Sequence, residues 1–285
     1  MGRACAQTVR RLLVQAGYAP RVNVKRFTGP PHPQRDRQFR YLREMTAAFH
    51  EARLPVISVD GKKKELIGAF KNPGAVWRRT PAEVNAHDFP QDAAGRAVPY
   101  GIYDLSRNQG SVAVGLSADT PEFATRSIAE WWRREGVRAY PDAGELLILA
   151  DSGGSNGCRP RAWKQGLQHR LANAFDLHVT VCHYPRGASK WNPVEHRLFG
   201  PISINWSGEP LTSLQKMLAL IRGTRTETGL TVSARADIRR YRNGVKVTNQ
   251  EMAELCLEHH SVCPNWNYTI SPQPIDNTSL NDTRK

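Results

Sequence analysis

The sequence lacks long apolar runs, and it lacks signals that direct a chain to a membrane. No stretch approaches the roughly 18 apolar residues of a membrane-spanning helix. The N-terminus, MGRACAQTVRRLL, has no apolar core of the kind found in secretory signals. Gly2 does not begin a myristoylation motif, because Ala6 stands where Ser or Thr is required. These absences predict a cytoplasmic protein with no membrane attachment.

Cysteine is scarce and is not paired. The five cysteines are an odd number and include no CxxC motif, which indicates reduced thiols rather than a disulfide framework. Cys256, His259, His260 and Cys263 form a C-x2-H-H-x2-C pattern. That spacing matches no common zinc finger. We favour a helix end in which these side chains are incidental, and a zinc site stays as the alternative.

Acidic residues are in clear minority. The chain has 40 Lys and Arg against 26 Asp and Glu, a formal charge of +14 and a sequence pI of about 9.9. A field of this sign favours polyanionic partners, above all nucleic acid, so we expect a protein that acts at the nucleoid. Residues 1–60 hold eleven basic and four acidic residues, a net +7, which is half of the total charge.

This basic N-terminal arm is expected to contact the DNA backbone. Residues 8–18 fit a short amphipathic helix that contains Arg10 and Arg11, our candidate DNA-binding residues. It resembles the second helix of a helix-turn-helix without a first helix before it. We therefore predict a partial helix-turn-helix at 1–26, and a Pro-rich connector and helix at 27–54.

The rest of the chain alternates between apolar strands and helices. A hydrophobic content of 40% is enough for a packed core. We expect strands at 55–60, 98–105, 111–118, 145–151 and 177–185, and helices at 120–136, 160–175, 192–206 and 211–224. Three antiparallel strands followed by alternating helices and strands is the order of a ribonuclease-H-like α/β fold, a mixed sheet flanked by helices. We place this core at 55–224, an extension packed on it at 225–270, and a disordered tail at 271–285.

Two predicted strands end in acids. Asp60 and Asp151 each close an apolar run, and the carboxyl ends of neighbouring parallel strands open onto one crevice. Carboxylates gathered there repel one another unless a cation lies between them. Glu195, at a helix start, is a third candidate. Such oxygen ligands suit Mg²⁺ or Mn²⁺, and two ions about 4 Å apart clamp the oxygens of a phosphodiester.

Each acid also has a simpler interpretation. Strand-end aspartates often only cap turns. Glu195 follows Asn192 and Pro193 at the spacing of a capping box, which would give it a structural role. Taken together on the right elements, the three acids favour a metal-dependent catalytic site.

Basic and aromatic residues flank these acids and are candidates for DNA contacts. We weigh phosphate binding against a solvated charge run for the lysines, and base stacking against core packing for the tryptophan. The set is Lys62, Lys63 and Lys64 after the first acid, and Lys190, Trp191 and Arg197 around the third.

The segment DSGG at 151–154 also resembles the nucleophile segment of chymotrypsin-like serine proteases. Ala150 and Ser155 replace the flanking Gly and Pro of that motif, and the α/β pattern disagrees with it. We instead interpret Gly153, Gly154 and Gly157 as a flexible loop that lets a nucleic-acid backbone approach Asp151.

The combined motifs resemble the Azo-thirteen group of insertion-sequence DDE transposases, and the segment around Asn192-Pro193-x-Glu195 is similar to the third-acid segment of mariner-like transposases. The resembling stretches are VISVDGKKKELIGAFKNPG (56–74), HDFP (87–90), AVPYGIYDL (97–105), ADSGGSNG (150–157), VCHYPRGASKWNPVEHRLF (181–199), LTSLQ (211–215), TGLTV (228–232) and WNYTI (266–270). They span most of the chain from about residue 8 to residue 270.

The resemblance implies a mechanism. Asp60, Asp151 and Glu195 would hold two Mg²⁺ or Mn²⁺ ions, with Asp60 bridging them. Water would cut double-stranded DNA at an element end, and the freed 3′-OH would attack target DNA, in a homodimer assembled on the DNA.

The sequence departs from the group at several points. Members of the group carry a fuller helix-turn-helix. Gly61 and Ser152 replace the Thr and Gly that are expected beside the first two acids. Two alternatives stay open: a nuclease of the same fold that cuts without joining, and a truncated, inactive DNA-binding remnant.

Overall fold

The structure is a computed structural model, and it describes residues 5–19, 21, 32–85 and 90–274. The chain divides into two units, residues 1–33 and 34–285. In the first unit, helix α1 (Ala6–Gln15) confirms the expected short helix. None of its residues is buried, and its apolar residues Val9, Leu12 and Leu13 are about half exposed.

The second unit is built on one mixed sheet of nine strands, counted over the described residues. The strands are β1 (Val56–Gly61), β2 (Glu65–Ile67), β3 (Gly95–Asp104), β4 (Gln109–Gly115), β5 (Glu145–Asp151), β6 (His178–Tyr184), β7 (Thr231–Asp237), β8 (Leu257–His259) and β9 (Asn267–Ile270). Their order across the sheet is β7-β4-β3-β1-β5-β6-β9-β8, and β2 pairs with β3. All five strands expected from the sequence are present.

The middle of the sheet has the ribonuclease-H-like arrangement. β1, β3 and β4 are an antiparallel meander, and β5 and β6 run parallel to β1 on its other side. The chain crosses from β4 to β5 and from β5 to β6 through helices. β5 has the sequence ELLILAD and is buried from Leu146 to Ala150, as is typical of a parallel strand covered on both faces.

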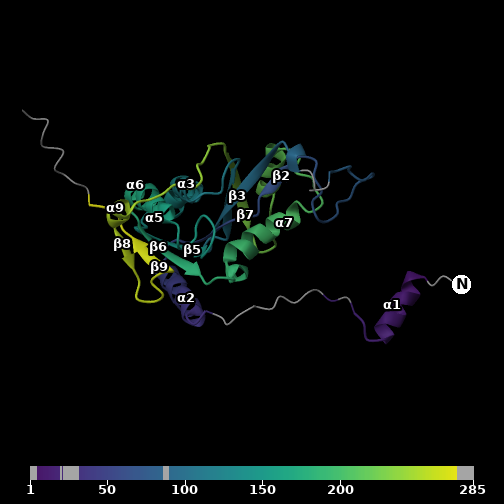
Figure 1. Ribbon diagram of the computed structural model, residues 1–285, viewed down its shortest axis with the longest axis horizontal. Coiled ribbons are helices and arrows are strands. Elements are labelled where there is room, and N and C mark those ends of the chain that lie inside the picture. Colours follow the sequence, from purple (N-terminus) through teal and green to yellow (C-terminus); the bar gives the residue numbers. More distant parts are fainter. Residues whose placement is uncertain (1–4, 20, 22–31, 86–89, 275–285) are drawn as a thin grey trace, which may run out of the picture. The chain divides into compact units, whose positions relative to one another are not determined.

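Helices cover both faces of the sheet. α3 (Pro121–Trp131) and α5 (Arg161–Leu167) pack against each other and bury Phe123, Ile128 and Trp163 in a cluster with β1, β3 and β5 (Figure 1). The opposite face carries α7 (Gly200–Asn205) and α8 (Leu214–Arg222), and also α2 (Arg35–Glu51) beside β5 and β6. Short elements complete the set: η1 (Pro90–Asp92), η2 (Trp132–Gly136), α4 (Val137–Ala139), η3 (Gln168–Ala172), α6 (Asn173–Phe175), η4 (Ser189–Trp191), η5 (Val194–Phe199) and α9 (Asn249–Ala253).

The helix expected at 120–136 begins as predicted. Thr120 caps α3 by accepting the amide of Phe123 at 3.2 Å, and Pro121 occupies the first turn. The regular helix ends at Trp131 and continues as the π-helical turn η2, so the predicted single helix consists of two pieces, and α4 extends it to Ala139. The helix expected at 160–175 is divided in the same way by the π-helical turn η3.

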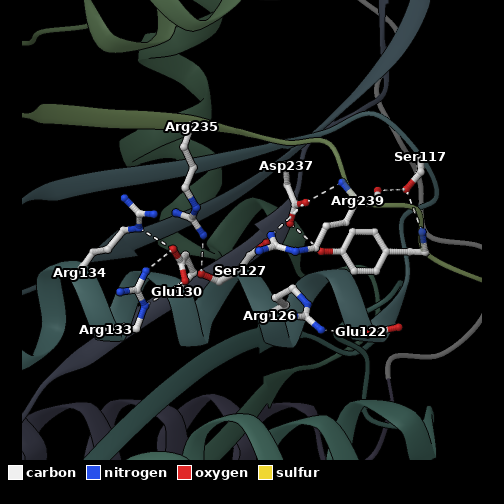
Figure 2. Close-up of polar contacts among 11 residues, drawn as sticks. Ser117, Glu122, Arg126, Ser127, Glu130, Arg133, Arg134, Arg235, Asp237 and Arg239 are labelled. Carbon is white, nitrogen blue, oxygen red and sulfur yellow. Dashed lines mark hydrogen bonds and ion pairs between the residues drawn. The ribbon is translucent and has the colours of Figure 1, made fainter.

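The C-terminal extension adds strands at both edges of the sheet. β7 adds parallel to β4, and β9 adds antiparallel to β6. Figure 2 shows a polar contact between β7 and α3, in which Arg235 Nη2 donates to Ser127 O at 3.0 Å. Beside it, Asp237 at the end of β7 accepts from Arg239, which follows in the same segment. Residues 225–270 therefore contribute three strands, β7, β8 and β9, to the sheet.

Two expected boundaries differ from the structure. α2 lies in the larger unit, where Leu42 and Phe49 are buried in the core, so the connector ends before this helix. The expected tail begins too early, because Gln168 donates to Ser271 O at 2.7 Å and Asn173 accepts the Gln273 amide. Residues 275–285 lie outside the described residues.

The C-x2-H-H-x2-C segment follows helix α9 and contains β8. Both ring nitrogens of His260 are engaged, Nδ1 with Tyr41 Oη at 2.7 Å and Nε2 with Thr269 Oγ1 at 2.8 Å. His259 Nδ1 lies 2.6 Å from Pro264 O. Within the described parts of the chain, no three His, Cys, Asp or Glu side chains form a group that fits a metal ion. The segment is a strand and the turn after it, rather than the expected helix end.

Candidate active site

The sheet brings the first two acids to one edge. β1 and β5 are parallel neighbours, paired from Val56 with Leu147 to Val59 with Ala150. Asp60 and Asp151 follow the last of these pairs, at the carboxyl ends of the two strands. Side chains alternate along a strand, so Asp60 lies on the opposite face from Val59, which packs in the α3 cluster.

The third acid lies on a helical turn and not on a strand. Glu195 lies in η5, a π-helical turn that follows β6 and leads into α7. Its carboxyl group lies close to that of Asp60, and each affects the pKa of the other. Two adjacent carboxyl groups repel one another when both are charged. The structure thus brings Asp60 and Glu195 close together. Asp151 lies near enough for its charge to raise the pKa of both.

A buried amide connects the three segments. Asn192 is fully buried, and its Nδ2 donates to Asp151 Oδ1 at 3.0 Å. Its Oδ1 accepts from the hydroxyl of Ser58, which also accepts the amide of Val194 at 2.9 Å. Ser58 lies on β1, two residues before Asp60, so this network fixes the start of η5 against both strands.

The capping-box interpretation of Asn192 and Glu195 is wrong. The residue that precedes η5 is Pro193, and no side chain caps this turn. The Glu195 amide is bonded to the backbone carbonyl of Asn192 at 3.1 Å, and the side chains of both residues face other acids. The Asn192 side chain is used for Asp151, a role that sequence spacing does not reveal.

The site disfavours negative charge. Burial and the charge of Asp151 raise the pKa of Asp60 to about 8, against a smaller opposing effect of the Gly61 amide, which donates to Asp60 Oδ1 at 2.7 Å. Burial also raises the pKa of Glu195, again with a contribution from Asp151. Burial raises the pKa of Asp151, and the Asn192 amide opposes this shift.

The chemical types of the three side chains suit a hard divalent cation. In the described structure, none of the three carboxylates forms an ion pair with Lys, Arg or His. The donors are all carboxylate oxygens, which Mg²⁺ and Mn²⁺ prefer. Among the described residues, the three acids are not arranged around one common metal position. Asp60 lies next to Glu195, while Asp151 contacts Asn192.

Of the three lysines after Asp60, only the first lies at the site. Lys62 forms an ion pair with Glu65 at 2.7 Å, and its Nζ lies 4.8 Å from the centroid of the Trp206 ring. Its positive charge opposes the rise in the pKa of Glu195. Lys63 and Lys64 are exposed.

The residues around Glu195 separate into two groups. Trp191 packs edge-on against Phe39, with Lys190 Nζ 4.1 Å from its ring centroid, and remains 42% exposed. It lines an open cavity of about 900 Å³ beside α2. Arg197 is exposed, and its positive charge opposes the rise in the pKa of Tyr103 that burial causes. Arg10 and Arg11 lie in the first unit and are exposed on α1.

A second cavity opens at Asp151. It has a volume of about 470 Å³, and the loop from Ser152 to Gly154 lines it together with Arg159 and Arg186. Gly153 and Gly154 line this cavity, whereas Gly157 packs against the backbone of Ser152 and Gly153.

One acid near this edge was not anticipated. Asp119 follows β4 and directly precedes the Thr120 cap of α3. A β-carbon placed on Gly61 would lie 3.5 Å from Asp119 Oδ2. An acid shortly after an apolar strand is the signal that identified Asp60 and Asp151, and it applies to Asp119 as well.

Comparison with known proteins assigns this architecture to a family. No curated protein matches the sequence. Solved structures with similar folds include a Mos1 transposase paired-end complex with left transposon end (14% identity, TM-score 0.46, 73% of this chain and 59% of that chain). A pre-cleavage Mos1 transpososome (13%, 0.47, 73% and 60%) and the Mos1 Strand Transfer Complex (14%, 0.46, 74% and 59%) are others.

The chain spans about 59–60% of the length of these Mos1 chains. No helix in the described regions has the length and apolar character needed to cross a membrane. The family described as Rhodopirellula transposase DDE domain matches residues 2–272, which is nearly the whole sequence, and it is of the Azo-thirteen type that the motifs indicated. The chain therefore belongs to this family of DDE transposase domains.

Proposed function

We propose that this protein is a metal-dependent DNA transposase that cuts the ends of an insertion sequence and joins them to target DNA. The observation that carries the proposal is the convergence of Asp60, Asp151 and Glu195 from two parallel strands and a helix onto one sheet edge. The family supports the use of a divalent metal. We propose that Asp60, Asp151 and Glu195 would hold two Mg²⁺ or Mn²⁺ ions.

The residues of the site would have separate roles. The carboxylates of Asp60, Asp151 and Glu195 would hold the ions, which when bound polarise the phosphodiester and the attacking oxygen. Asn192 would keep Asp151 aimed at the site through its 3.0 Å hydrogen bond. Water would first replace the 3′ oxygen at the element end, leaving a 3′-OH. This hydroxyl would then attack a target phosphodiester and release the target's own 3′-OH.

Positive side chains around the site would hold the DNA. Lys62 lies beside Glu195, and Lys63 and Lys64 extend from it into solvent. Lys190, Trp191 and Arg197 flank Glu195 in the sequence and are exposed. We assign these residues, with Arg10 and Arg11 of α1, to contacts with double-stranded DNA, at the element ends and the target.

Two further parts of the proposal concern assembly and place. An element has two ends, and each chain has one set of three acids, so we propose a homodimer assembled on DNA. Because its substrate is chromosomal, we propose that the protein acts in the cytoplasm at the nucleoid.

Substitution of one acid separates catalysis from binding. Asp151→Asn is expected to abolish cleavage of a duplex carrying the element end while leaving its DNA affinity within about twofold. Glu145→Gln is the matched control, because Glu145 begins the strand that Asp151 ends and is exposed. Unchanged cleavage by Asp151→Asn would refute the assignment. Cutting without joining by the unaltered protein would indicate a nuclease.

A further inference from the structure

The open cavity of about 900 Å³ beside α2 combines apolar, aromatic and basic side chains, and we call it the α2 groove. Helix α2 lines it from Arg35 to His50 and packs along β5 and β6 (Figure 1). Leu42 and Leu149 are buried beneath it in one hydrophobic cluster. Of the residues assigned above to DNA contacts, only Trp191 lines this groove. The rest of the lining has no role in the proposed function.

The α2 groove leads to the three acids. Leu149 lines it, and Asp151 lies two residues further along β5, so both side chains are on the same face of the sheet. Tyr184 also lines it, pairs with Asp151 across β5 and β6, and has a pKa that burial raises with a contribution from the charge of Asp151. Pro193 lines it directly after Asn192, whose amide donates to Asp151. A DNA strand with a phosphate at the acids can therefore continue into the groove.

The lining of the groove carries positive charge. Arg35, Arg40 and Arg43 line it together with one acid, Asp36, which gives a formal charge of +2 with His50 neutral. Arg40 and Arg43 are exposed, and neither forms an ion pair with any residue that the structure describes. The planar guanidinium group matches the geometry of phosphate oxygens. This charge favours a polyanionic occupant.

Trp191 provides an accessible aromatic ring in the same groove. It is 42% exposed, although Phe39 packs edge-on against it. Arg35 Cζ lies 5.1 Å and Lys190 Nζ lies 4.1 Å from the ring centroid, as expected for cation–π contacts. Lys190 is exposed and has a flexible stem, so a base can replace it on the ring while its ammonium group pairs with a neighbouring phosphate. Aromatic rings beside a basic groove are the typical binding surface for unpaired bases.

We propose that the α2 groove binds an unpaired DNA strand at the element end, with one base stacked on Trp191 and the flanking phosphates held by Arg40 and Arg43. The proposal rests on the proposed function, since it concerns the strand that leaves the three acids. It adds a substrate form, because a base can stack on Trp191 only after it has left its own partner in the duplex.

Binding of a fluorescein-labelled oligothymidylate to the full chain, followed by anisotropy in EDTA, tests the stacking. Trp191→Ala should weaken binding of this single strand about tenfold, the size expected for the loss of one base–aromatic stack. Trp191→Phe should retain most of the affinity, because it keeps an aromatic face. Trp77→Ala should leave the affinity unchanged, because Trp77 is fully exposed and lies outside the groove lining. A fully paired duplex of the same length should lose less affinity with Trp191→Ala than the single strand does.

The arginines are tested by salt. Arg40→Ala with Arg43→Ala should lower the salt slope of log K for the single strand by about 1.4, since each phosphate contact contributes about 0.7. Arg133→Ala with Arg134→Ala is the control, because these arginines lie away from the groove and are paired with Glu130. If Trp191→Ala proves unfolded by circular dichroism, the slope of the exposed Arg40 and Arg43 pair decides instead.

Three outcomes would overturn the proposal: unchanged oligothymidylate affinity in Trp191→Ala, equal weakening of single strand and duplex by that variant, or an unchanged salt slope in the Arg40 and Arg43 variant. Because EDTA prevents metal-dependent cutting and joining, the result is independent of the proposed function. Joined DNA product from the unaltered protein, together with any of these three outcomes, would refute the groove alone. Binding as predicted, with no joined product, would refute the transposase function alone.

Discussion

Asn192 Nδ2 donates to Asp151 Oδ1 at 3.0 Å, while the side-chain carbonyl oxygen of Asn192 accepts from Ser58 on the neighbouring strand. One fully buried amide thus connects the β1 strand, the end of β5 and the turn that bears Glu195. The relative position of Asp151 and Glu195 depends on this side chain, and not only on the sheet.

Asn192→Ala should therefore lower both metal affinity and stability. Loss of an outer-shell partner typically costs about 10–100-fold in metal affinity, and an unpaired Ser58 hydroxyl costs about 1–3 kcal/mol. Mn²⁺ titration and urea unfolding measure the two effects. Asn205→Ala is the control, because that exposed amide donates only to the Leu220 carbonyl. Equal behaviour of the two variants would show that Asn192 does not position Asp151.

The metal-free protein should become less stable as pH rises from about 4 to about 8. The pKa of Asp60 is about 8 in the folded chain and 3.8 ordinarily, so over this range the folded state binds more protons than the unfolded state. The slope from this group is at most about 1.4 kcal/mol per pH unit. Urea unfolding in EDTA at several pH values measures it. Asp60→Asn should flatten the dependence; an equally steep slope in that variant would assign it to other groups.

Gly101→Ala should displace the turn that carries Glu195. A β-carbon on Gly101 of β3 would lie 2.5 Å from the Phe199 ring and 3.1 Å from Leu198, both on η5. Overpacking of this kind costs about 1–3 kcal/mol. Gly95→Ala lies on the same strand in open space and should be close to neutral by thermal unfolding. No difference in melting temperature between the two variants would contradict this packing.

The basic arm should act on affinity rather than chemistry. Replacing Arg10 and Arg11 with Ala should weaken DNA binding and lower the salt slope of log K by about 2, since each phosphate contact contributes about 0.9. Arg133→Ala with Arg134→Ala removes the same charge from residues that are paired with Glu130. An unchanged slope for the arm variant, measured by fluorescence anisotropy, would remove α1 from the DNA interface.

The sequence was informative where local pattern and topology agree. Asp60 and Asp151 could be placed because each ends an apolar strand, and parallel neighbours expose their carboxyl ends at one edge. The pairing of β7 with β4, and of β9 with β6, was not visible, because strands far apart in sequence pair through contacts that no local period encodes. The role of Asn192 was not predicted: its spacing to Glu195 allowed a capping box as an alternative, while in the structure its side chain belongs to a buried network that includes Asp151.

Joining of DNA ends tests the central claim most directly. Pre-cut oligonucleotide ends from the DNA flanking the gene are incubated with the protein, a plasmid target and Mg²⁺ or Mn²⁺. We predict joined product that is lost with EDTA and with Glu195→Gln, and that persists with Glu145→Gln, whose side chain lies at the far end of β5. Joined product that survives Glu195→Gln would contradict the three-acid site. Salt-sensitive DNA binding without any joining would contradict transposase activity and favour a DNA-binding remnant.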